Sequence, residues 1–218
     1  MALTRIKDAR KLVDFIESNT SFELISSNLC PYNNHIAALF TDVVLQAGLN
    51  YKSIVVPRVA HVLRNYPSTT TVSSFRDLII SEGLEKVILW KNEVKLQRVL
   101  DLIQFCVDNE INSSCELKNF LLTQENKIAF LNLKGFGNKT YDYLLKLLNV
   151  DTIAVDRHIY SFLDKAGITV TDYNYTKSVV EFAADIMNIS RRSIDYSIWF
   201  FMAYEEKKLT KQAVLEFA

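Results

Sequence analysis

Glycine and proline are both scarce in this sequence, with 5 and 3 residues among 218. Proteins built from many hairpins or βα units usually need more of these turn residues, so their scarcity favours helices. The 3 cysteines, Cys30, Cys106 and Cys115, are odd in number and lack metal-ligand spacing. We expect them to pack as small apolar side chains in a reduced, disulfide-free protein. No apolar run approaches the ~18 residues of a membrane-spanning helix, and the charged N-terminal segment does not resemble a signal peptide.

Charge of either sign is not in excess, because 25 basic residues balance 25 acidic ones. No overall electrostatic field therefore attracts the protein to nucleic acid or to an anionic membrane. Any binding of a polyanion must depend on a local basic patch and on backbone amides. The apolar fraction of 49% is ample for a packed core. We expect a soluble, intracellular protein.

Apolar residues recur with helical spacing along most of the chain, which predicts an all-α fold. The first helix is expected to follow a Thr4 cap. The other predicted helices cover 35–47, 57–65, 74–81, 84–90, 93–108, 115–122, 124–132, 138–148, 156–165, 176–188, 191–207 and a short tail helix from Thr210. Only 53–56 and 168–171 have the composition of extended strands, which is too little for a sheet.

A short glycine hairpin, LKGFGNKT, separates the predicted helices 124–132 and 138–148. Gly135 and Gly137 let another backbone approach closely, and Phe136 between them is expected to point into the core. The helix that follows presents unpaired N–H groups and a partial positive dipole, which together suit a phosphate. Several lysines against one Glu125 make residues 118–141 locally basic. An ordinary helix–helix turn is the alternative interpretation.

Lys139 directly follows the hairpin, in the first turn of a predicted helix. The helix dipole disfavours a positive charge there, so this lysine is a candidate for a role in chemistry. An uncharged amine can attack a sugar C1′ atom and form a Schiff base. A solvated lysine and a simple phosphate contact are the alternatives.

Asp156 begins the predicted helix 156–165, and aspartate is a preferred N-cap. Bonded to backbone amides, it is expected to stay ionised. An ionised carboxylate near a sugar stabilises an oxocarbenium-like transition state and helps to activate a nucleophile. A simple helix cap is the alternative.

The combination of LKGFGNKT, a helix and IAVDRHIYSFL resembles the helix–hairpin–helix (HhH-GPD) DNA glycosylase superfamily. This group contains endonuclease III and the 8-oxoguanine DNA glycosylases. Lys139 matches the Schiff-base lysine of the bifunctional members, Asp156 the catalytic aspartate, and His158 its neighbouring histidine. The clear match covers residues 124–165, and a weaker one extends from about 35 to 205. Lys134 replaces the common proline of the hairpin. The four-cysteine loop of endonuclease III is absent, so no iron–sulfur cluster is expected.

The resemblance implies a two-lobed helical fold with the active site in the cleft between the lobes. The expected lobes are a central bundle at 36–150 and a second lobe from 1–35 together with 151–218. It also implies a bifunctional DNA glycosylase/AP lyase for base excision repair, which removes a damaged, most plausibly oxidised, base through a lysine Schiff base. A monofunctional glycosylase, a non-catalytic DNA-binding protein and a helical interaction protein are the alternatives.

Further DNA contacts follow from the same resemblance, because such enzymes flip a nucleotide out and fill the gap with side chains. The turn at 45–51 would supply one such side chain, from Gln46, Leu49 or Asn50, and the turn at 89–92 the other, from Trp90 or Lys91. A core position for Trp90 and a solvated helix position for Gln46 are the alternatives. The expected DNA-binding residues are Lys134, Gly135, Phe136, Gly137, Asn138, Thr140, His158, Gln46, Asn50 and Trp90. Candidates for the base pocket, with core packing as the alternative, are Asp195, Tyr196, Trp199 and Phe200.

The expected partner is double-stranded DNA with a damaged base or an abasic site, bound by a monomer that does not use a membrane. No cofactor is expected, although the resemblance allows a monovalent cation at the hairpin. The expected location is the cytoplasm, in association with the nucleoid, or the nucleus.

Overall fold

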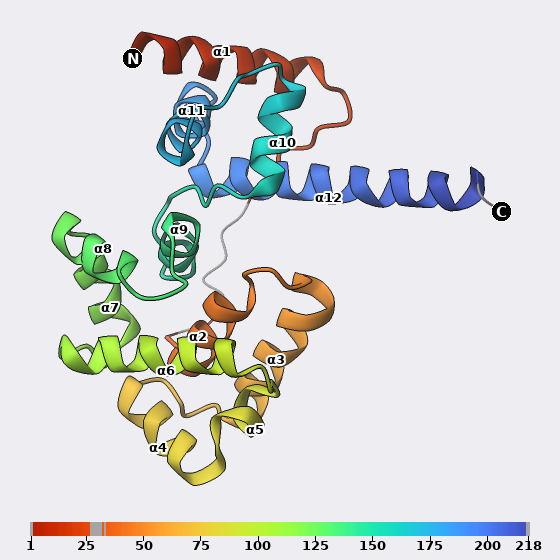
Figure 1. Ribbon diagram of the computed structural model, residues 1–218. Helices are drawn as coiled ribbons and strands as arrows, with labels where there is room; N and C mark the ends of the chain where they lie inside the picture. Colours follow the sequence, from red (N-terminus) through yellow and green to blue (C-terminus); the bar gives the residue numbers. More distant parts are fainter. Residues whose placement is uncertain (1, 27–31, 33, 217–218) are drawn as a thin grey trace. The chain divides into compact units, whose positions relative to one another are not determined.

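The computed structural model describes residues 2–26, 32 and 34–216, and those residues form helices and connecting turns without a strand (Figure 1). The prediction of an all-α fold is confirmed. Within the described residues, every helix is too short or too polar to cross a bilayer. The chain divides into two compact units. We call Cys30–Val150 the hairpin unit, and Met1–Leu29 with Asp151–Ala218 the terminal unit.

The hairpin unit is a helical bundle around one buried helix, α2. Its elements are α2 (Ile36–Leu45), the π-helical turn η1 (Tyr51–Val55), α3 (Val56–Asn65), α4 (Val72–Glu82), α5 (Leu84–Ile88), α6 (Glu93–Asp108), α7 (Ser114–Leu121), α8 (Gln124–Leu131) and α9 (Asn138–Leu147). All 10 residues of α2 are buried, and the helix packs against α3, α4, α6 and α9. An apolar helix surrounded in this way has no polar face, so its few polar groups need partners inside the protein.

Asp42 is the only charged residue of α2 and is fully buried. Three tyrosine hydroxyls from separate parts of the chain donate hydrogen bonds to its carboxylate. Tyr51 donates to Oδ2 at 3.1 Å, Tyr143 donates to Oδ1 at 2.9 Å, and Tyr32 also donates to Oδ2. Burial raises the pKa of Asp42, while these hydrogen bonds act against the rise. We refer to the four residues as the tyrosine–aspartate cluster.

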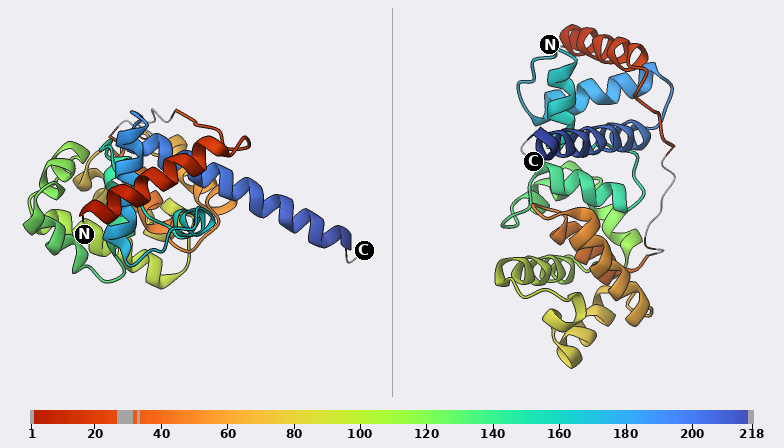
Figure 2. Two further views of the ribbon diagram at one scale, coloured as in Figure 1. Left: turned by 90° about the horizontal axis from the view of Figure 1, so that it is seen from above. Right: turned by 90° about the vertical axis from the view of Figure 1, so that its right-hand side faces the viewer.

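The terminal unit contains α1 (Ala2–Ser18), α10 (Arg157–Lys165), α11 (Tyr173–Ile186) and α12 (Arg191–Glu216). In this unit α1 packs along α11, and α10 packs against α12. Phe162 is fully buried at the centre of the core, with aromatic rings 5.3–5.6 Å away on Phe15, Phe22 and Phe201. Figure 2 shows α12 as one continuous helix.

Several local predictions were wrong. Residues 53–56 are helical rather than extended, because the Asn50 side chain caps η1 through the Ser53 amide at 3.0 Å and Val55 packs into the core. Tertiary packing overrides the β-propensity of this segment. Residues 168–171 form an irregular connection.

Some helix ends also differ from the prediction. The first helix already includes Ala2, so Thr4 is not its cap. Helix α11 begins three residues early, because the Asp172 side chain accepts a hydrogen bond from the Tyr175 amide and caps it. The tail helix expected from Thr210 is part of α12.

Asp42→Asn should remove a pH-dependent loss of stability. The raised pKa means that the folded protein holds this proton more tightly than the unfolded chain, whose ordinary value is 3.8. The free energy by which this bound proton stabilises the fold is fully present below the ordinary pKa. It is lost as the pH rises through the raised pKa of the folded protein. The variant should therefore gain free energy of unfolding relative to the wild type from about pH 4 upward. Chemical denaturation at several pH values measures this difference.

Asp77→Asn is the matched control, because Asp77 is exposed on α4. The free energy of unfolding of this variant should differ from that of the wild type by nearly the same amount at every pH in that series. If the difference for Asp42→Asn is just as flat, burial of this carboxylate does not control the pH dependence of stability.

Candidate active site and nucleic-acid interface

The glycine hairpin joins α8 to α9 and is fixed by its central phenylalanine. Phe136 is only 5% exposed, and its ring lies 5.2 Å from that of Phe130. Its amide donates to the Leu133 carbonyl at 3.1 Å. Gly135 has φ +87°, a conformation that side chains rarely adopt. The inward orientation expected for Phe136 is confirmed, so its side chain anchors the turn, while the flanking Gly135 and Gly137 are exposed.

The first turn of α9 starts at Gly137, which provides no side-chain cap. A side chain at Gly137 would meet nothing within 4 Å. The N–H groups of a helix's first turn have no partner within the helix, and the dipole there favours an anion. The space beside Gly137 therefore gives an anion a direct approach to this turn. Among the neighbouring residues expected to contact DNA, Lys134 is exposed, Asn138 is partly exposed and Thr140 is buried.

Lys139 lies in that first turn, and its ammonium donates to Oε1 of Gln46 at 2.6 Å. Gln46 ends α2 and is 8% exposed. Its amide nitrogen donates to the Val43 carbonyl at 3.3 Å. Both ends of the Gln46 side-chain amide are therefore engaged, and Gln46 positions Lys139 in this structure.

Helices α2 and α9 make a second polar contact, one helical turn deeper in the bundle. Asp42 precedes Gln46 by four residues on α2, and Tyr143 follows Lys139 by four residues on α9, so each pair shares a helix face. Tyr143 donates to Asp42 as Lys139 donates to Gln46. Two consecutive polar contacts thus fix the register of α9 on α2, and with it the position of Lys139.

A second lysine closes the carboxyl end of α2. Lys95 is 9% exposed, and its ammonium donates to the carbonyls of Val44 and Ala47, at 2.7 Å each. The last carbonyls of a helix have no partner within it and carry a partial negative charge, so a cation stabilises them. Burial lowers the pKa of Lys95 to about 8, with further contributions from the charges of Arg98 and Lys139.

The Arg98 side chain of α6 lies against the glycine hairpin. A Cβ atom on Gly135 would lie 2.3 Å from Nε of Arg98, so the guanidinium group covers this glycine directly. Lys95, Arg98 and Lys139 thus gather around the end of α2 and the hairpin. We call these three residues the cation cluster.

Asp156 belongs to the terminal unit and caps α10. Its Oδ1 accepts hydrogen bonds from the amides of His158 at 2.9 Å and Ile159 at 3.2 Å. The N-cap role expected from the sequence is therefore confirmed. His158 is 7% exposed. The buried Asp195 of α12 accepts from the Ala154 amide at 2.8 Å and so supports the segment that leads to Asp156.

The two turns predicted to fill a gap in DNA differ in what they expose. In the turn after α2, Leu49 is partly buried, and Asn50 is exposed but caps η1. In the turn between α5 and α6, Trp90 is partly buried beneath the Arg58 guanidinium, 4.7 Å from the ring centroid. Its indole N–H is buried without a partner among the described residues.

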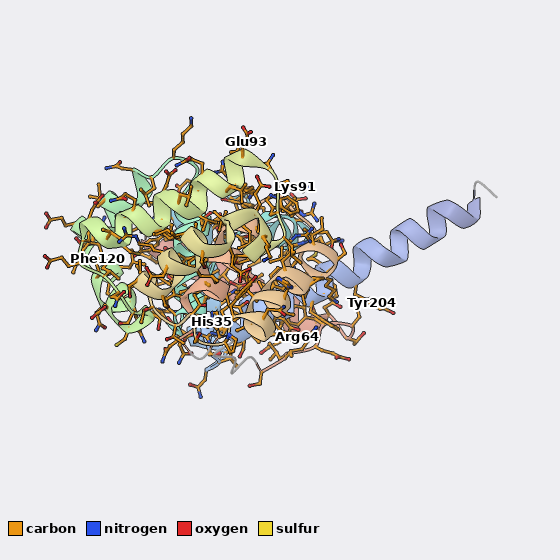
Figure 3. All side chains as sticks on the ribbon, turned by 90° about the horizontal axis from the view of Figure 1, so that it is seen from below. His35, Arg64, Lys91, Glu93, Phe120 and Tyr204 are labelled. Carbon is orange, nitrogen blue, oxygen red and sulfur yellow. The ribbon has the colours of Figure 1, made fainter. Side chains whose placement is uncertain are left out.

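Leu89, next to Trp90, is the apolar side chain that this second turn exposes. It is 47% exposed at φ +51°, an uncommon conformation for leucine. The Arg58 guanidinium donates to its carbonyl at 2.9 Å and helps to hold it there. Lys91 is also exposed, and Figure 3 labels it beside Glu93 at the start of α6.

The aromatic residues of α12 do not all pack as core. Tyr196 stacks on Trp199 with ring centroids 5.7 Å apart, and Tyr196 and Phe200 are 36% and 41% exposed. Of the cysteines, Cys106 is buried as expected, and burial raises the pKa of its thiol to about 12. Cys115 is exposed, so its expected packing was wrong, and Cys30 lies outside the described residues.

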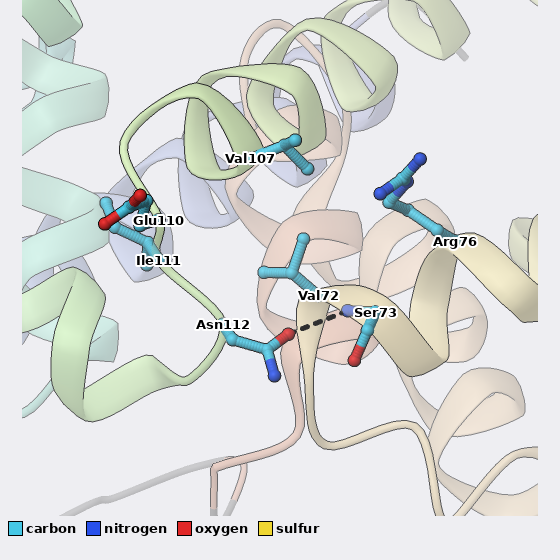
Figure 4. A pocket seen from close by; sticks show the side chains of 7 residues that line it. All are labelled: Val72, Ser73, Arg76, Val107, Glu110, Ile111 and Asn112. Atoms are coloured by element: carbon cyan, nitrogen blue, oxygen red, sulfur yellow. Dashed lines mark hydrogen bonds between the residues drawn. The ribbon is translucent and has the colours of Figure 1, made fainter.

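A small cavity of about 220 Å³ lies elsewhere in the hairpin unit, between the start of α4 and the end of α6 (Figure 4). The Ser73 amide donates across it to the Asn112 side chain at 2.9 Å. None of the residues predicted to form the active site lines this cavity. Among the described residues, no three His, Cys, Asp or Glu side chains group in a way that could hold a metal ion.

One known protein family matches most of the chain. The family described as "Domain of unknown function (DUF8548)" matches residues 10–203. The chain belongs to this family. No curated protein matches it significantly.

A solved structure similar to this DUF8548 member is that of H. pylori 3-methyladenine DNA glycosylase (MagIII) bound to 1,N6-ethenoadenine. The two chains are 18% identical, the match covers 94% of this chain and 97% of that one, and the TM-score is 0.51. At this identity the likeness concerns the fold. The DUF8548 chain thus resembles a helical DNA glycosylase in fold.

Sequence reasoning missed Lys95, Asp42 and Leu89, although two of them leave a signal. Lys95 precedes Val99 by four residues and so falls on the apolar face of the predicted helix 93–108. Asp42 is the only charge in a ten-residue apolar helix. A charged residue on a buried face needs partners, but the sequence does not say which. The exposure of Leu89 has no such signal.

The two hairpin glycines should respond differently to alanine. Gly135→Ala combines φ +87° with a contact of 2.3 Å to the Arg98 side chain, and should lower the free energy of unfolding by about 1 kcal/mol or more. Gly137→Ala adds a methyl group where nothing lies within 4 Å and should stay within about 0.5 kcal/mol of the wild type. Chemical unfolding of both variants measures the difference. Equal losses would contradict the described geometry of the hairpin.

Proposed function

We propose that this protein is a DNA glycosylase that removes a damaged base from duplex DNA and then nicks the strand through Lys139. The main observation in favour is the placement of Lys139 in the first turn of α9, beside the glycine hairpin and bonded to Gln46. The fold likeness to a solved glycosylase supports the removal of a base. The sequence resemblance to the bifunctional helix–hairpin–helix glycosylases supports the nicking through Lys139.

In this proposal the hairpin binds the DNA backbone. A phosphate approaches Gly137, where the open space permits close contact, and accepts hydrogen bonds from the first amides of α9. Exposed Lys134 adds a positive charge nearby. These contacts place the sugar but read no sequence, because phosphates are the same at every step.

Lys139 performs the chemistry on the sugar. Its neutral amine attacks C1′, the bond between C1′ and the base breaks, and the base leaves with the electron pair and takes up a proton. Loss of the amine proton and opening of the sugar ring give a Schiff base. A proton then leaves C2′ and the 3′ phosphate departs, which cuts the strand. The nucleophile is an amine, so the proposed reaction needs no cofactor.

Asp156 is proposed to act as the carboxylate of the same reaction. One oxygen is held by the amides of His158 and Ile159, which orients the group. A carboxylate fixed in this way stabilises positive charge that develops on the sugar. The proposal requires Asp156 and Lys139, which belong to different units, to act on the same nucleotide.

Leu89 is the side chain that we propose to fill the space left by the flipped nucleotide. Flipping costs a few kcal/mol of stacking and pairing, and an apolar wedge compensates part of that cost. Leu89 is exposed on a turn whose conformation Arg58 supports, whereas Trp90 already packs against the same arginine. Asn50 remains the candidate in the other turn.

A glycosylase that releases a methylated or otherwise alkylated base without cutting the strand is the second candidate. The observation that favours it is the fold likeness to a protein described as a 3-methyladenine DNA glycosylase bound to 1,N6-ethenoadenine. Oxidised bases follow from the sequence resemblance instead. A panel of duplexes with one oxidised or alkylated base each, scored for base release and for nicking, separates the two.

Lys139→Gln should abolish covalent capture of DNA. Borohydride reduces a Schiff base to a stable amine, so wild-type protein mixed with a lesion or abasic duplex should give a protein–DNA adduct, seen as a shifted band on a denaturing gel. The glutamine variant has no amine and should give none. An adduct retained in this variant would place the nucleophile elsewhere, and base release without any adduct would favour the second candidate.

Asp156→Asn provides the complementary variant, because asparagine still caps a helix. It should bind an abasic-site analogue almost as the wild type does while base release falls at least about 100-fold, the usual contribution of a positioned electrostatic group. Equal losses of binding and turnover would indicate that Asp156 is a structural cap only.

Gly137→Ala should weaken DNA binding without unfolding the protein. Its methyl group occupies the space through which the phosphate approaches, although it disturbs nothing within the protein. Titration of a tetrahydrofuran-containing duplex should show weaker affinity at every salt concentration and a shallower dependence on salt, because one ionic contact is lost. Unchanged affinity would remove the hairpin from the interface.

A further inference from the structure

Gln46 is a long polar residue at the end of a buried helix. It caps α2, its backbone amide donates to the Asp42 carbonyl at 2.9 Å, and it is only 8% exposed. The sequence resemblance makes Gln46 a candidate to fill a gap in DNA. A polar side chain with so little exposure instead needs partners within the protein, and it has them in Val43 of the same helix and Lys139 of α9.

These two partners determine which end of the Gln46 side-chain amide faces Lys139. A backbone carbonyl can only accept, so the amide nitrogen faces Val43, to which it donates at 3.3 Å. The amide oxygen is left for Lys139, whose ammonium can only donate and does so at 2.6 Å. Exchanging the two ends of the amide would break both hydrogen bonds. The oxygen that meets Lys139 is therefore fixed in orientation.

An uncharged oxygen is a suitable acceptor for an amine that has to react. A neutral amine has two N–H bonds and one lone pair, and the lone pair is what attacks. Because the Gln46 oxygen carries no hydrogen, it binds an N–H of Lys139 and leaves the lone pair to point elsewhere. A carboxylate in the same place would also accept, but its negative charge would favour the ammonium form, which cannot attack. An amide directs the amine without that effect.

Entry of Gln46 into DNA would break its contact with Lys139. The side chain would have to leave a nearly buried position, and both of its hydrogen bonds would be lost. Lys139 would lose this acceptor at the moment when the proposed reaction needs the amine in place. A gap-filling role for Gln46 and its contact with Lys139 therefore exclude each other. Asn50, in the same turn, is already exposed.

We propose that Gln46 is a positioning residue, which keeps its hydrogen bond to Lys139 while this amine attacks the sugar and does not enter the DNA. This inference rests on the proposed function, because only a nucleophilic lysine has an attack to direct. Lysine has a flexible four-carbon stem, so an acceptor at its far end restricts where the amine lies. A misplacement of about 1 Å can lower a rate about 100-fold.

The test measures adduct formation in the wild type, Gln46→Met, Gln46→Glu and Gln104→Met. Each protein, in excess over a duplex with a preformed abasic site, is reduced with cyanoborohydride between about pH 5.5 and 9.5, where a perturbed lysine titrates. The rate constant reports the chemistry, and the amplitude reports the folded fraction. Gln104 is exposed on α6 and bonded to Asp108 at 2.7 Å, so its variant is the same substitution at the surface.

Gln46→Met should lower the rate constant about 10- to 100-fold at every pH, because a thioether is too weak an acceptor to hold the amine. Its affinity for a tetrahydrofuran-containing duplex should change little, because the proposed role involves no contact with DNA. The same loss of rate should appear on a single-stranded oligonucleotide with an abasic site. Gln104→Met should match the wild type in all three measurements.

Gln46→Glu keeps an acceptor of the same length and adds a negative charge. The midpoint of its pH profile should rise by about one pH unit or more, because an adjacent anion favours the ammonium form of the lysine. An unmoved midpoint would mean that position 46 does not touch the reacting amine, and would overturn the inference. The other charged groups on the surrounding elements are the same in both proteins, namely Lys95, Arg98, Lys134, Asp42 and Asp142.

Two other roles for Gln46 predict different results. If it fills a gap in DNA, Gln46→Met should bind the tetrahydrofuran duplex more weakly and react normally with the single strand, which has no gap to fill. If it only supports the fold, Gln46→Met should lower the amplitude and leave the rate constant unchanged. Either result overturns this inference alone. If the wild type forms no adduct at any pH, the proposed lyase chemistry fails as well, so the two failures are distinguishable.

Discussion

The burial of α2 on all sides is the constraint on which the rest of the hairpin unit depends. A helix without a solvent face has no water to satisfy its last carbonyls, and Lys95 takes this role from α6. The one carboxylate in the helix is satisfied in the same manner by three phenols. These polar groups fix the neighbours of α2 in rotation and register, whereas apolar contacts alone would allow several arrangements.

The candidate site follows from this arrangement. Helix α9 contacts α2 through two polar pairs on matching faces, and the outer pair contains Lys139. Phe136 fixes the preceding turn to the same core. The Lys139 amine and the hairpin amides are therefore carried by rigid elements, which keeps their mutual geometry constant. In the terminal unit, Asp156 is held in a comparable way by the amides of α10.

Helical periodicity was sufficient to predict most of this fold, because apolar spacing is a local property of the sequence. The cap at Asp156 and the anchor at Phe136 were predictable for the same reason. Residues 53–56 were misread because their helix depends on packing. The partners of Lys95 and Lys139 are 51 and 93 residues distant in sequence, so no local pattern reveals them. The predicted lobe boundaries and DNA contacts remain predictions.

The open first turn of α9 has an energetic consequence for any ligand that binds there. Many helices satisfy their leading amides with a side chain, and an incoming anion must first displace it. Gly137 offers no such group, so an anion does not have to displace a capping side chain. Association at this turn then involves little reorganisation of the protein, and release leaves the turn ready for the next encounter.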